Sequence, residues 1–428
     1  MKVASAAGNT KTALLLLFGA YALSITDRMI LSVLFEPIRL EFGATDTQMG
    51  LLGGLSFALF YATLGLPIAR LADRYNRRLI IVTSLGLFSA MTAMSGLALS
   101  FLMLFLFRIG VGIGEAGVNP ASQSIIADLY PKERRATAMS ILAVGAPVGM
   151  IGGFLIGGLV SQMFGWRAAM FAVGVPGVVL AILMFYFLRE PVRGATDISP
   201  HTQEADAPSG ILPAAGYMFR SPALRQLLIA STLTGMASYG ASTWLPTFFV
   251  RVHDLSQGQV GLLMAFLFGG LGAVGTFVGG RLFDRLSAPG FDRGLKMIAV
   301  VQVATVPFSV AAYLAGSFTG AIFLFMLPAF AANFFLGPTL ALIQTLSPVP
   351  MRAVAAAIKM FCLNLVGMSL GPFLVGVISD WLAPVYDERS LAIALAVLTC
   401  MSLWSAAHFW LCGRAIRVTE VNGDQTHG

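Results

Sequence analysis

Apolar stretches of about 20 residues follow one another along almost the whole chain, and this feature constrains the fold most. A stretch of that length crosses the ~30 Å hydrocarbon core of a bilayer as an α-helix. Of the 428 residues, 57% are hydrophobic and only 11% are charged, whereas soluble domains carry about 25% charged residues. The sequence therefore predicts an all-α, polytopic membrane protein.

The apolar stretches predict twelve transmembrane helices. They lie at about residues 12–36, 48–72, 78–99, 101–129, 136–163, 166–188, 222–249, 257–283, 294–314, 318–346, 352–380 and 390–412. Residues 189–221 are polar and rich in proline, and we interpret them as a cytoplasmic linker with a short amphipathic helix near residues 212–219.

The positive charges are distributed asymmetrically among the loops. About 20 of the 27 Lys and Arg residues fall in alternate loops and the termini, about four in the other loops, and three within predicted helices. This bias predicts that both termini are cytoplasmic. The net charge of +7 is thus explained by topology, so we do not expect nucleic acid as a partner. The short loops favour a bacterial inner membrane.

Two motifs of the first half recur in the second half. The sequence Arg-Leu-Ala-Asp-Arg at 70–74 matches Arg-Leu-Phe-Asp-Arg at 281–285, which follows 211 residues later. Similarly, Arg-Ala-Thr-Ala at 135–138 matches Arg-Ala-Val-Ala at 352–355. The repeats predict two pseudo-symmetric six-helix bundles, residues 1–188 and 222–428 with a short cytoplasmic tail, joined by the linker 189–221. A substrate site is expected near the midplane.

Several motifs give these repeats a specific resemblance. The loop Asp73-Arg74-Tyr75-Asn76-Arg77-Arg78 resembles the loop between helices 2 and 3 of the major facilitator superfamily, although Ala69 and Asn76 replace its usual glycines. Other segments, with this loop, resemble the Spinster branch of that superfamily. They are Asp27-Arg28, Arg108 with Gly112-x-Gly114-Glu115-Ala116, Ile126-Ala127-Asp128-Leu129, Ala146-Pro147-Val148-Gly149 and Gly165-Trp166-Arg167.

The resemblance implies how such a chain works. It implies that helices 1, 4, 7 and 10 line a central cavity and that Asp27 and Glu115 are proton-linked acids. The sequence contains no nucleotide-binding loop of the G-x-x-x-x-G-K-[ST] kind, which excludes ATP bound through that loop as the driving force. We therefore expect no cofactor and a transporter driven by the proton gradient.

Four ionisable residues lie within the first and fourth predicted helices. Arg108 and Glu115 are seven residues apart, about 10 Å along one helix face. A charge at the bilayer centre costs at least ~2.5–3.5 kcal/mol, so each needs a partner. Counting depth along the two opposed helices places Asp27 level with Arg108, and Arg28 within reach of Glu115. Protonation of Asp27 would free an arginine for an anionic headgroup; the alternative is a permanently paired structural network.

Further residues are candidates for contact with a substrate. Asn119 precedes Pro120 on the same helix as Arg108, where a kink could serve gating or only packing. Tyr239, Trp244 and Asn333 carry polar groups in an otherwise apolar and aromatic second half. Such a wall favours an amphiphile, although the same side chains could simply pack. Lys359 could attract a headgroup, but we favour the alternative that its side chain extends toward the cytoplasm.

The charged loops are expected to control access to the cavity. We expect Asp73 near the start of helix 11, and Arg77 or Arg78 paired with Asp128. Arg74, Asp284 and Arg285 belong to the same repeated loops, whose second copy would pair with helix 5. Glycines spaced four apart at 149–157, 275–279 and 367–371 would let the two bundles approach each other closely. Static packing is the alternative for these glycines.

The sequence as a whole predicts a monomeric, proton-coupled transporter of an anionic amphiphile such as a lysophospholipid or a sphingoid lipid. Small organic or sugar acids, or drugs in a multidrug efflux antiporter, are alternative substrates. A non-transporting membrane sensor is less favoured, because no soluble domain is predicted. An enzyme is not expected: the His residues form no catalytic or metal-binding set in the sequence.

Overall fold

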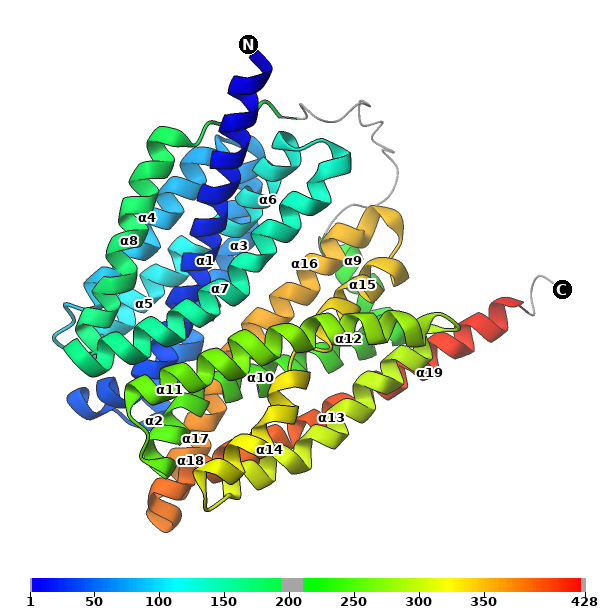
Figure 1. The fold of residues 1–428 in the computed structure, drawn as a ribbon. Helices are drawn as coiled ribbons and strands as arrows, with labels where there is room; N and C mark the ends of the chain where they lie inside the picture. Colours follow the sequence, from blue (N-terminus) through cyan, green and yellow to red (C-terminus); the bar gives the residue numbers. More distant parts are fainter. Residues whose placement is uncertain (1, 194–210, 425–428) are drawn as a thin grey trace. The chain divides into compact units, whose positions relative to one another are not determined.

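The computed structural model describes residues 2–193 and 211–424, and these residues are almost entirely helical, without a β-strand among them (Figure 1). The helices of the first half are α1 (Lys2–Phe42), α2 (Asp46–Gly50), α3 (Ser56–Arg74), α4 (Arg77–Ser95), α5 (Phe101–Glu115), α6 (Val118–Leu129), α7 (Lys132–Phe164) and α8 (Trp166–Phe187). A short π-helical segment, η1 (Leu51–Leu55), joins α2 to α3.

The second half is built in the same way. Its helices are α9 (Ile211–Arg220), α10 (Pro222–His253), α11 (Gln257–Met264), α12 (Gly272–Ser287), α13 (Phe291–Leu314), α14 (Phe318–Ala331), α15 (Leu336–Leu346), α16 (Arg352–Cys362), α17 (Ser369–Tyr386), α18 (Ser390–Thr399) and α19 (Met401–Asp424). The π-helical segments η2 (Ala265–Leu271) and η4 (Leu363–Met368) continue α11 into α12 and α16 into α17, and short 3₁₀ turns η3 (Val349–Met351) and η5 (Asp387–Arg389) precede α16 and α18.

Ten helical stretches in the described residues are long and apolar enough to cross a membrane. Nine of them match single predicted helices, and the tenth, Val349–Val418, contains the last two predicted ones. The helix α10, predicted as the seventh span, is not among the ten; it carries Arg225 and many serines and threonines. The all-helical membrane fold predicted from the sequence is confirmed.

The helices group into two compact units. Unit 1 contains residues 1–203 and 254–269, and unit 2 contains residues 204–253 and 270–428. The segment 254–269 comes from the second half of the chain but packs with unit 1, because α11 lies against α7. Gly158 and Gly261 face each other in this contact, which brings the two helix backbones close.

Unit 1 is organised around α1, which runs beside α7 and also contacts α8 (Figure 1). The close approach of α7 depends on Gly149 and Gly153. A methyl group on Gly153 would lie 2.7 Å from the carbonyl oxygen of Thr26, and one on Gly149 would overlap the Ala22 carbonyl. These glycines therefore serve packing inside unit 1, and the predicted role in contacts between bundles was wrong for them.

The other two glycine faces also pack inside their own unit. Gly275 and Gly279 of α12 lie against Phe330 and Phe334, and Gly367 and Gly371 lie against α10 at Gly235–Gly240. Helices without side chains at the contact can approach closely wherever backbones cross, so glycine spacing alone does not identify the partner.

Both units contain a transmembrane helix that is broken in the middle. The predicted helix 101–129 divides into α5 and α6 at Ala116–Gly117, and the predicted helix 318–346 divides into α14 and α15 at Ala332–Phe335. Pro120 and Pro338 follow the breaks. Proline has no N–H, so the carbonyls four residues earlier, in Ala116 and Phe334, lack a helical donor. The break lies before Pro120, and the repeat is thus visible in the structure as well as in the sequence.

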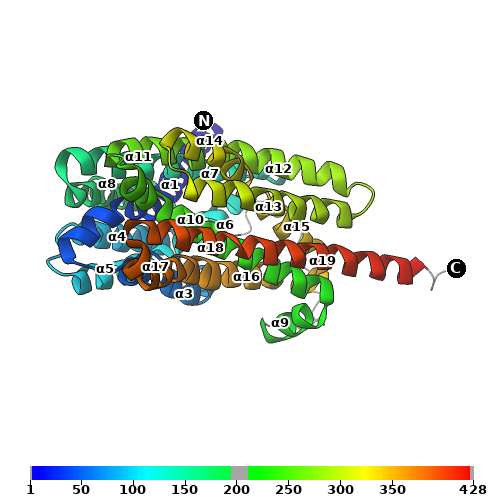
Figure 2. The same cartoon turned by 90° about the horizontal axis from the view of Figure 1, so that it is seen from below.

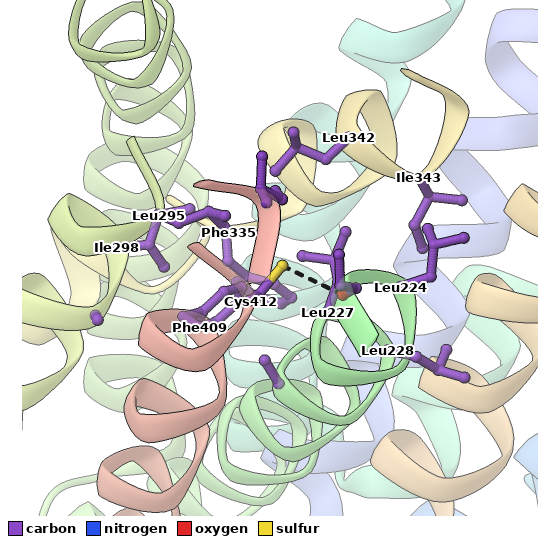
Figure 3. Close-up of a cluster of buried hydrophobic side chains, with 14 of the residues drawn as sticks. Leu224, Leu227, Leu228, Leu295, Ile298, Phe335, Leu342, Ile343, Phe409 and Cys412 are labelled. Atoms are coloured by element: carbon purple, nitrogen blue, oxygen red, sulfur yellow. Dashed lines mark hydrogen bonds between the residues drawn. The ribbon is translucent and has the colours of Figure 1, made fainter. Parts of the chain in front are cut away.

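An apolar cluster of buried residues joins several helices of unit 2 (Figure 3). Leu224, Leu227 and Leu228 of α10 meet Leu342 and Ile343 of α15 there. Cys412 of α19 donates its thiol to the Ala223 carbonyl at 3.3 Å in the same cluster. Figure 2 shows α19 extending beside α13 and α10, against which it packs.

The short helix α9 lies where the sequence predicts a helix at the end of the linker, although apolar residues are found on both its buried and its exposed sides. Ala214 and Met218 are buried, whereas Leu212 and Phe219 are exposed. The helix packs against α10 and α16. Residues 194–210 of the linker lie outside the described residues.

Candidate functional site

The first ion pair of unit 1 joins α1 to α5. Arg108 Nη1 donates to Asp27 Oδ2 at 2.8 Å, and both side chains are almost completely buried. The hydroxyl of Thr92 on α4 donates to the other carboxylate oxygen of Asp27. Both oxygens of Asp27 are thus hydrogen-bonded. The structure contains the Asp27–Arg108 contact that the depth argument predicts.

The second ion pair lies on the same two helices. Arg28 Nε donates to Glu115 Oε1 at 2.8 Å, and the hydroxyl of Ser24 donates to the same oxygen. Ser24, Asp27 and Arg28 share a face of α1, because they are three and four residues apart. The side chain of Arg28 is 14% exposed, whereas that of Glu115 is fully buried. This second predicted pairing is present as well.

Two aromatic rings of α3 cover the arginines. Phe57 and Tyr61 stack with their ring centroids 5.3 Å apart. The guanidinium carbon of Arg28 lies 4.5 Å from the centroid of Tyr61 and 5.0 Å from that of Phe57. Arg108 lies 5.9 Å from the Phe57 centroid. The cations are therefore held over apolar ring faces, which attract positive charge.

Glycines of α5 bring the pieces together. A methyl group on Gly112 would lie 2.6 Å from the carbonyl oxygen of Phe57, and Gly114 packs equally closely on Phe88 of α4. Because α5 carries no side chain at these two positions, it approaches both α3 and α4. This approach sets Arg108 against Asp27 and Thr92, and Glu115 against Arg28 and Ser24.

Two polar atoms of the cluster are available for a further hydrogen bond or a proton. Glu115 Oε2 and Arg108 Nε are buried and have no hydrogen-bond partner within the described residues. A carboxylate oxygen in this position can receive a proton, and a guanidinium N–H can donate to an incoming oxygen atom. Two acids and two arginines give no net charge when all are ionised, so one added proton leaves one positive charge uncompensated.

A separate polar site surrounds Arg77 at the start of α4. Arg77 is 2% exposed. Its Nη1 pairs with Asp128 at 2.5 Å, and its Nε pairs with Glu190 at 2.8 Å. Glu190 also accepts the backbone N–H of Arg78 at 2.8 Å. The predicted Arg77–Asp128 pair therefore exists, and it joins α4, α6 and the segment after α8 within unit 1.

The remaining loop residues have different surroundings. Arg78 lies over the ring of Phe185 and donates to the Phe185 carbonyl. Arg74 is exposed at the end of α3, and Asp284 and Arg285 are exposed on α12. The side chain of Asp73 lies outside the described part of the structure. The predicted contacts of Asp73, Asp284 and Arg285 with helices 11 and 5 stay predictions.

The predicted substrate residues are not equally accessible. Trp244 is completely buried, and its Nε1 donates to the Pro372 carbonyl of α17 at 2.8 Å, which favours a packing role. Tyr239 is half-buried against the apolar cluster of unit 2, and Asn333 is half-buried in the break between α14 and α15. Asn119, also half-buried, accepts a hydrogen bond from Gln123 at 3.1 Å.

The surroundings of Lys359 differ from those predicted from the sequence. The sequence suggested that its side chain extends toward the cytoplasm, but it is completely buried, and its Nζ has no hydrogen-bond partner among the described residues. On α16 it occupies the same face as the buried residues Ala355 and Leu363, four positions to either side. The long apolar stem is therefore directed into unit 2.

Several residues of these sites were not predicted from the sequence. Ser24, Phe57, Tyr61, Thr92 and Glu190 were not identified as site residues. Ser24 could have been found from its i, i+3, i+4 spacing with Asp27 and Arg28, and Glu190 from its charge directly after α8. Thr92 and the two aromatic residues have no distinguishing signal in an apolar helix, where such side chains are common.

Broken helices at corresponding positions in two repeats are a marker of secondary transporters, and comparison with known proteins identifies the family. Residues 17–372 match the Major Facilitator Superfamily. The chain belongs to this superfamily. It is 31% identical over 400 residues to an MFS-type efflux pump of Mycolicibacterium smegmatis, covering 92% of this chain and 90% of the relative. It is 28% identical to a probable L-galactonate transporter of Escherichia coli over 91% of this chain and 86% of the relative.

Solved structures support the same assignment and the resemblance to Spinster. The fold is similar to a bacterial homologue of the human lysosomal transporter Spinster in an inward-facing, unoccupied conformation, with a TM-score of 0.86 and 28% identity over 95% of this chain and 98% of that one. The occupied inward-facing structure of that homologue gives a TM-score of 0.83 at the same identity, over 95% and 97% of the two chains. This superfamily member is thus an integral membrane transporter similar to Spinster, not an enzyme.

Proposed function

We propose that this major facilitator is a proton-coupled transporter of an anionic amphiphile and that the buried charge cluster of unit 1 is its coupling site. The observation that carries the proposal is the pair of ion pairs Asp27–Arg108 and Arg28–Glu115, in which one oxygen of Glu115 has no hydrogen-bond partner among the described residues. Ionisable groups at membrane depth are costly and mark proton pathways or substrate sites.

Coupling follows from the charge balance of the cluster. Protonation of Asp27 or Glu115 leaves an arginine without its counter-ion. An anionic headgroup can then take the place of the carboxylate, because a guanidinium binds carboxylate and phosphate with the same planar fork. Binding of the proton therefore raises the affinity for the anion, and binding of the anion raises the affinity for the proton by the same factor.

The two acids are proposed to differ in their roles. Asp27 is held through both oxygens, by Arg108 and Thr92, so releasing it frees a fully buried arginine. Glu115 Oε2 has no partner among the described residues, so Glu115 accepts a proton without first breaking a bond at that oxygen. We therefore assign Glu115 as the first proton acceptor and Asp27 as the acid that controls Arg108.

The aromatic surroundings favour an amphiphile over a small hydrophilic acid. Arg28 lies over both Phe57 and Tyr61, so an anion bound to it would have apolar ring faces beside it. A lysophospholipid or sphingoid phosphate has an apolar chain for such surfaces. We further propose that both termini face the cytoplasm and that the protein acts as a monomer in a bacterial inner membrane.

The relatives supply a specific alternative. One is described as a probable L-galactonate transporter, and galactonate is a small sugar acid that an arginine would also bind. Another is described as an efflux pump, which would export its substrate. Neither description requires the stacked rings over Arg28.

Uptake into proteoliposomes distinguishes these substrates. The panel contains a lysophospholipid with a phosphate headgroup, a monoacylglycerol of equal chain length without charge, and a sugar acid. The proposal predicts transport of the lysophospholipid only, and its loss in Arg108→Gln. Transport of the sugar acid alone would retain the transporter and contradict the amphiphile. Transport of the uncharged lipid at an equal rate would contradict the role of the arginines.

A further inference from the structure

We infer that Lys359 forms a second anion-binding site, inside unit 2, that takes an oxyanion of the carboxylate or phosphate class. This inference rests on the proposed function where it assigns the anion to the substrate headgroup. The site itself stands on the burial, the missing partner and the acid-free surroundings of this one amine.

The environment of the amine is the first argument. Lys359 is 0% exposed, and its Nζ has no hydrogen-bond partner among the described residues. Its neighbours on the same helix face, Ala355 and Leu363, belong to the apolar cluster of unit 2. An ammonium without an acceptor in such surroundings is strongly destabilising, so a permanent structural role does not explain it.

The second argument is the composition of the elements that pack mainly against α16. The helix α16 packs mainly against α9, α10, α15 and the segments η3 and η4. None of these elements contains an aspartate or a glutamate, and α16 itself contains none. Their charged residues, apart from Lys359, are arginines, among them Arg220, Arg225 and Arg352. This part of unit 2 therefore has an excess of positive charge, which an external anion would neutralise.

The helix geometry gives a route for access. The π-helical segment η4 begins at Leu363, directly after α16, and Leu363 donates its backbone N–H to the carbonyls of Lys359 and Met360. A π-helical segment interrupts the regular hydrogen-bond ladder and frequently marks functional sites. At the other end, α16 begins at the 3₁₀ turn η3. Because irregular segments bound α16 at both ends, we place the access route for an anion at these ends of the helix.

Chemistry selects the class of ligand. A primary ammonium offers three N–H donors and a compact charge, which suits the oxygens of a carboxylate or a phosphate. The stem of the lysine and the neighbouring Leu363 would contact an apolar chain attached to that anion. Unit 2 would then hold the headgroup of an amphiphile through Lys359.

Thermal unfolding of the full-length, purified protein in a nonionic detergent tests the site. Dodecanoate, dodecyl phosphate and uncharged dodecanol are the probes, each titrated against wild type, Lys359→Met, Lys359→Gln and Lys359→Arg. The matched control is Lys296→Met, since Lys296 is partly exposed and already paired with Asp292 at 3.1 Å. It removes the same charge from a helix of the same unit.

The inference predicts two results together. Wild type, Lys359→Arg and Lys296→Met are stabilised by one or both anions and not by dodecanol, whereas Lys359→Met and Lys359→Gln require at least tenfold more anion. Without any anion, Lys359→Met melts at a higher temperature than wild type, because the unpartnered amine is gone. Response to dodecanoate only, or to dodecyl phosphate only, supports the site and identifies its ligand as a carboxylate or a phosphate.

Two results would overturn the inference. One is an unchanged response to both anions in Lys359→Met and Lys359→Gln. The other is a lower melting temperature of anion-free Lys359→Met together with an unchanged anion response in Lys359→Gln, which would assign the amine to structure. Loss of anion binding in Lys359→Met, combined with wild-type protein that moves no protons, would leave the site in place and reject only the proposed proton coupling.

Discussion

At the scale of single residues, a change to any member of the buried cluster removes the ion pair, hydrogen bond or ring contact of its partner. Arg28 has two functions at once, because its Nε binds Glu115 while its flat guanidinium covers Phe57 and Tyr61. Lysine keeps the charge but has neither the planar fork nor the same stacking.

We therefore predict that Arg28→Lys lowers the initial transport rate at least tenfold without changing the amount of folded protein. Contacts of this kind contribute about 0.5–2 kcal/mol for the rings and about 1.5–3 kcal/mol for the charged hydrogen bond. Uptake into proteoliposomes at matched protein density measures the rate. Arg134→Lys, an exposed position on α7, is the control. Equal rates for Arg28→Lys and wild type would contradict the stacking argument.

Thr92 provides a second prediction at this scale. Its hydroxyl donates to Asp27, and valine has the same shape without the donor. Loss of a hydrogen bond to a charged group costs about 1.5–3 kcal/mol, so Thr92→Val should weaken the hold on Asp27 and alter the proton dependence of transport. Thr83→Val, an exposed position on the same helix, should not. An identical dependence on external pH for Thr92→Val and wild type would show that Thr92 is dispensable.

The charged residues could be predicted from the sequence because their cost in a membrane forces them to pair, and helix depth limits the partners. Asp27, Arg28, Arg108 and Glu115 are the example. Thr92, Phe57 and Tyr61 could not be predicted, since such side chains in an apolar helix can face the lipid, a neighbouring helix or a functional site. Lys359 was misjudged because its distance from the helix end allowed an extended stem, and the sequence does not show which face of α16 is buried.

At the scale of elements, glycines decide which helices meet. Gly112 has the Phe57 carbonyl at the place where a methyl group would lie, so α5 depends on this glycine to contact α3. A proline also follows the breaks before α6 and α15, but prolines such as Pro147 and Pro246 lie inside continuous helices, so proline alone does not specify a break. The sequence shows the glycine spacing and the prolines, but it does not show which neighbouring backbone each glycine approaches, and three glycine faces were assigned to the wrong contact for that reason.

We predict that Gly112→Ala destabilises the protein by about 1–3 kcal/mol, the usual cost of overpacking, and lowers its melting temperature by at least about 2 °C. Gly65→Ala on α3 is the matched control, because no atom lies within 4 Å of the added methyl group there. It should be neutral or slightly stabilising, since alanine favours a helix over glycine. Thermal unfolding in detergent measures both. Equal melting temperatures for the two variants would refute the close-contact argument.

The Arg77 site joins three elements and predicts a different response. Asp128→Asn removes one of two carboxylates from a buried arginine, and breaking a buried pair from one side costs up to about 3–5 kcal/mol. Arg77 keeps Glu190 as a second partner in Asp128→Asn, so Arg77→Met should cost more than Asp128→Asn, and the double variant should cost less than the sum of the two single changes. A double-mutant cycle of melting temperatures tests this coupling. Strict additivity of the two single changes would mean that Arg77 and Asp128 do not stabilise each other.

At the scale of the whole molecule, membership of the major facilitator superfamily and the similarity to Spinster establish a membrane transporter built from an internal repeat. The buried charged residues differ between the two units. Unit 1 contains a neutral set of two acids and two bases, whereas unit 2 contains a lysine, Lys359, that is buried among apolar residues and has no hydrogen-bond partner in the part of the chain that the structure describes. The fold follows from periodicity and repeats alone, but this chemical asymmetry follows from side-chain placement and required the structure.

Proton movement into sealed proteoliposomes, followed with an internal pH-sensitive dye after addition of lysophospholipid, tests the central claim most directly. Wild type should acidify or alkalise the lumen in proportion to substrate moved, and Asp27→Asn and Glu115→Gln should abolish the proton signal while remaining folded. Glu133→Gln, an exposed acid on α7, should behave as wild type. Substrate-driven proton movement that persists in both Asp27→Asn and Glu115→Gln would contradict the account, because the buried cluster would then not carry the proton.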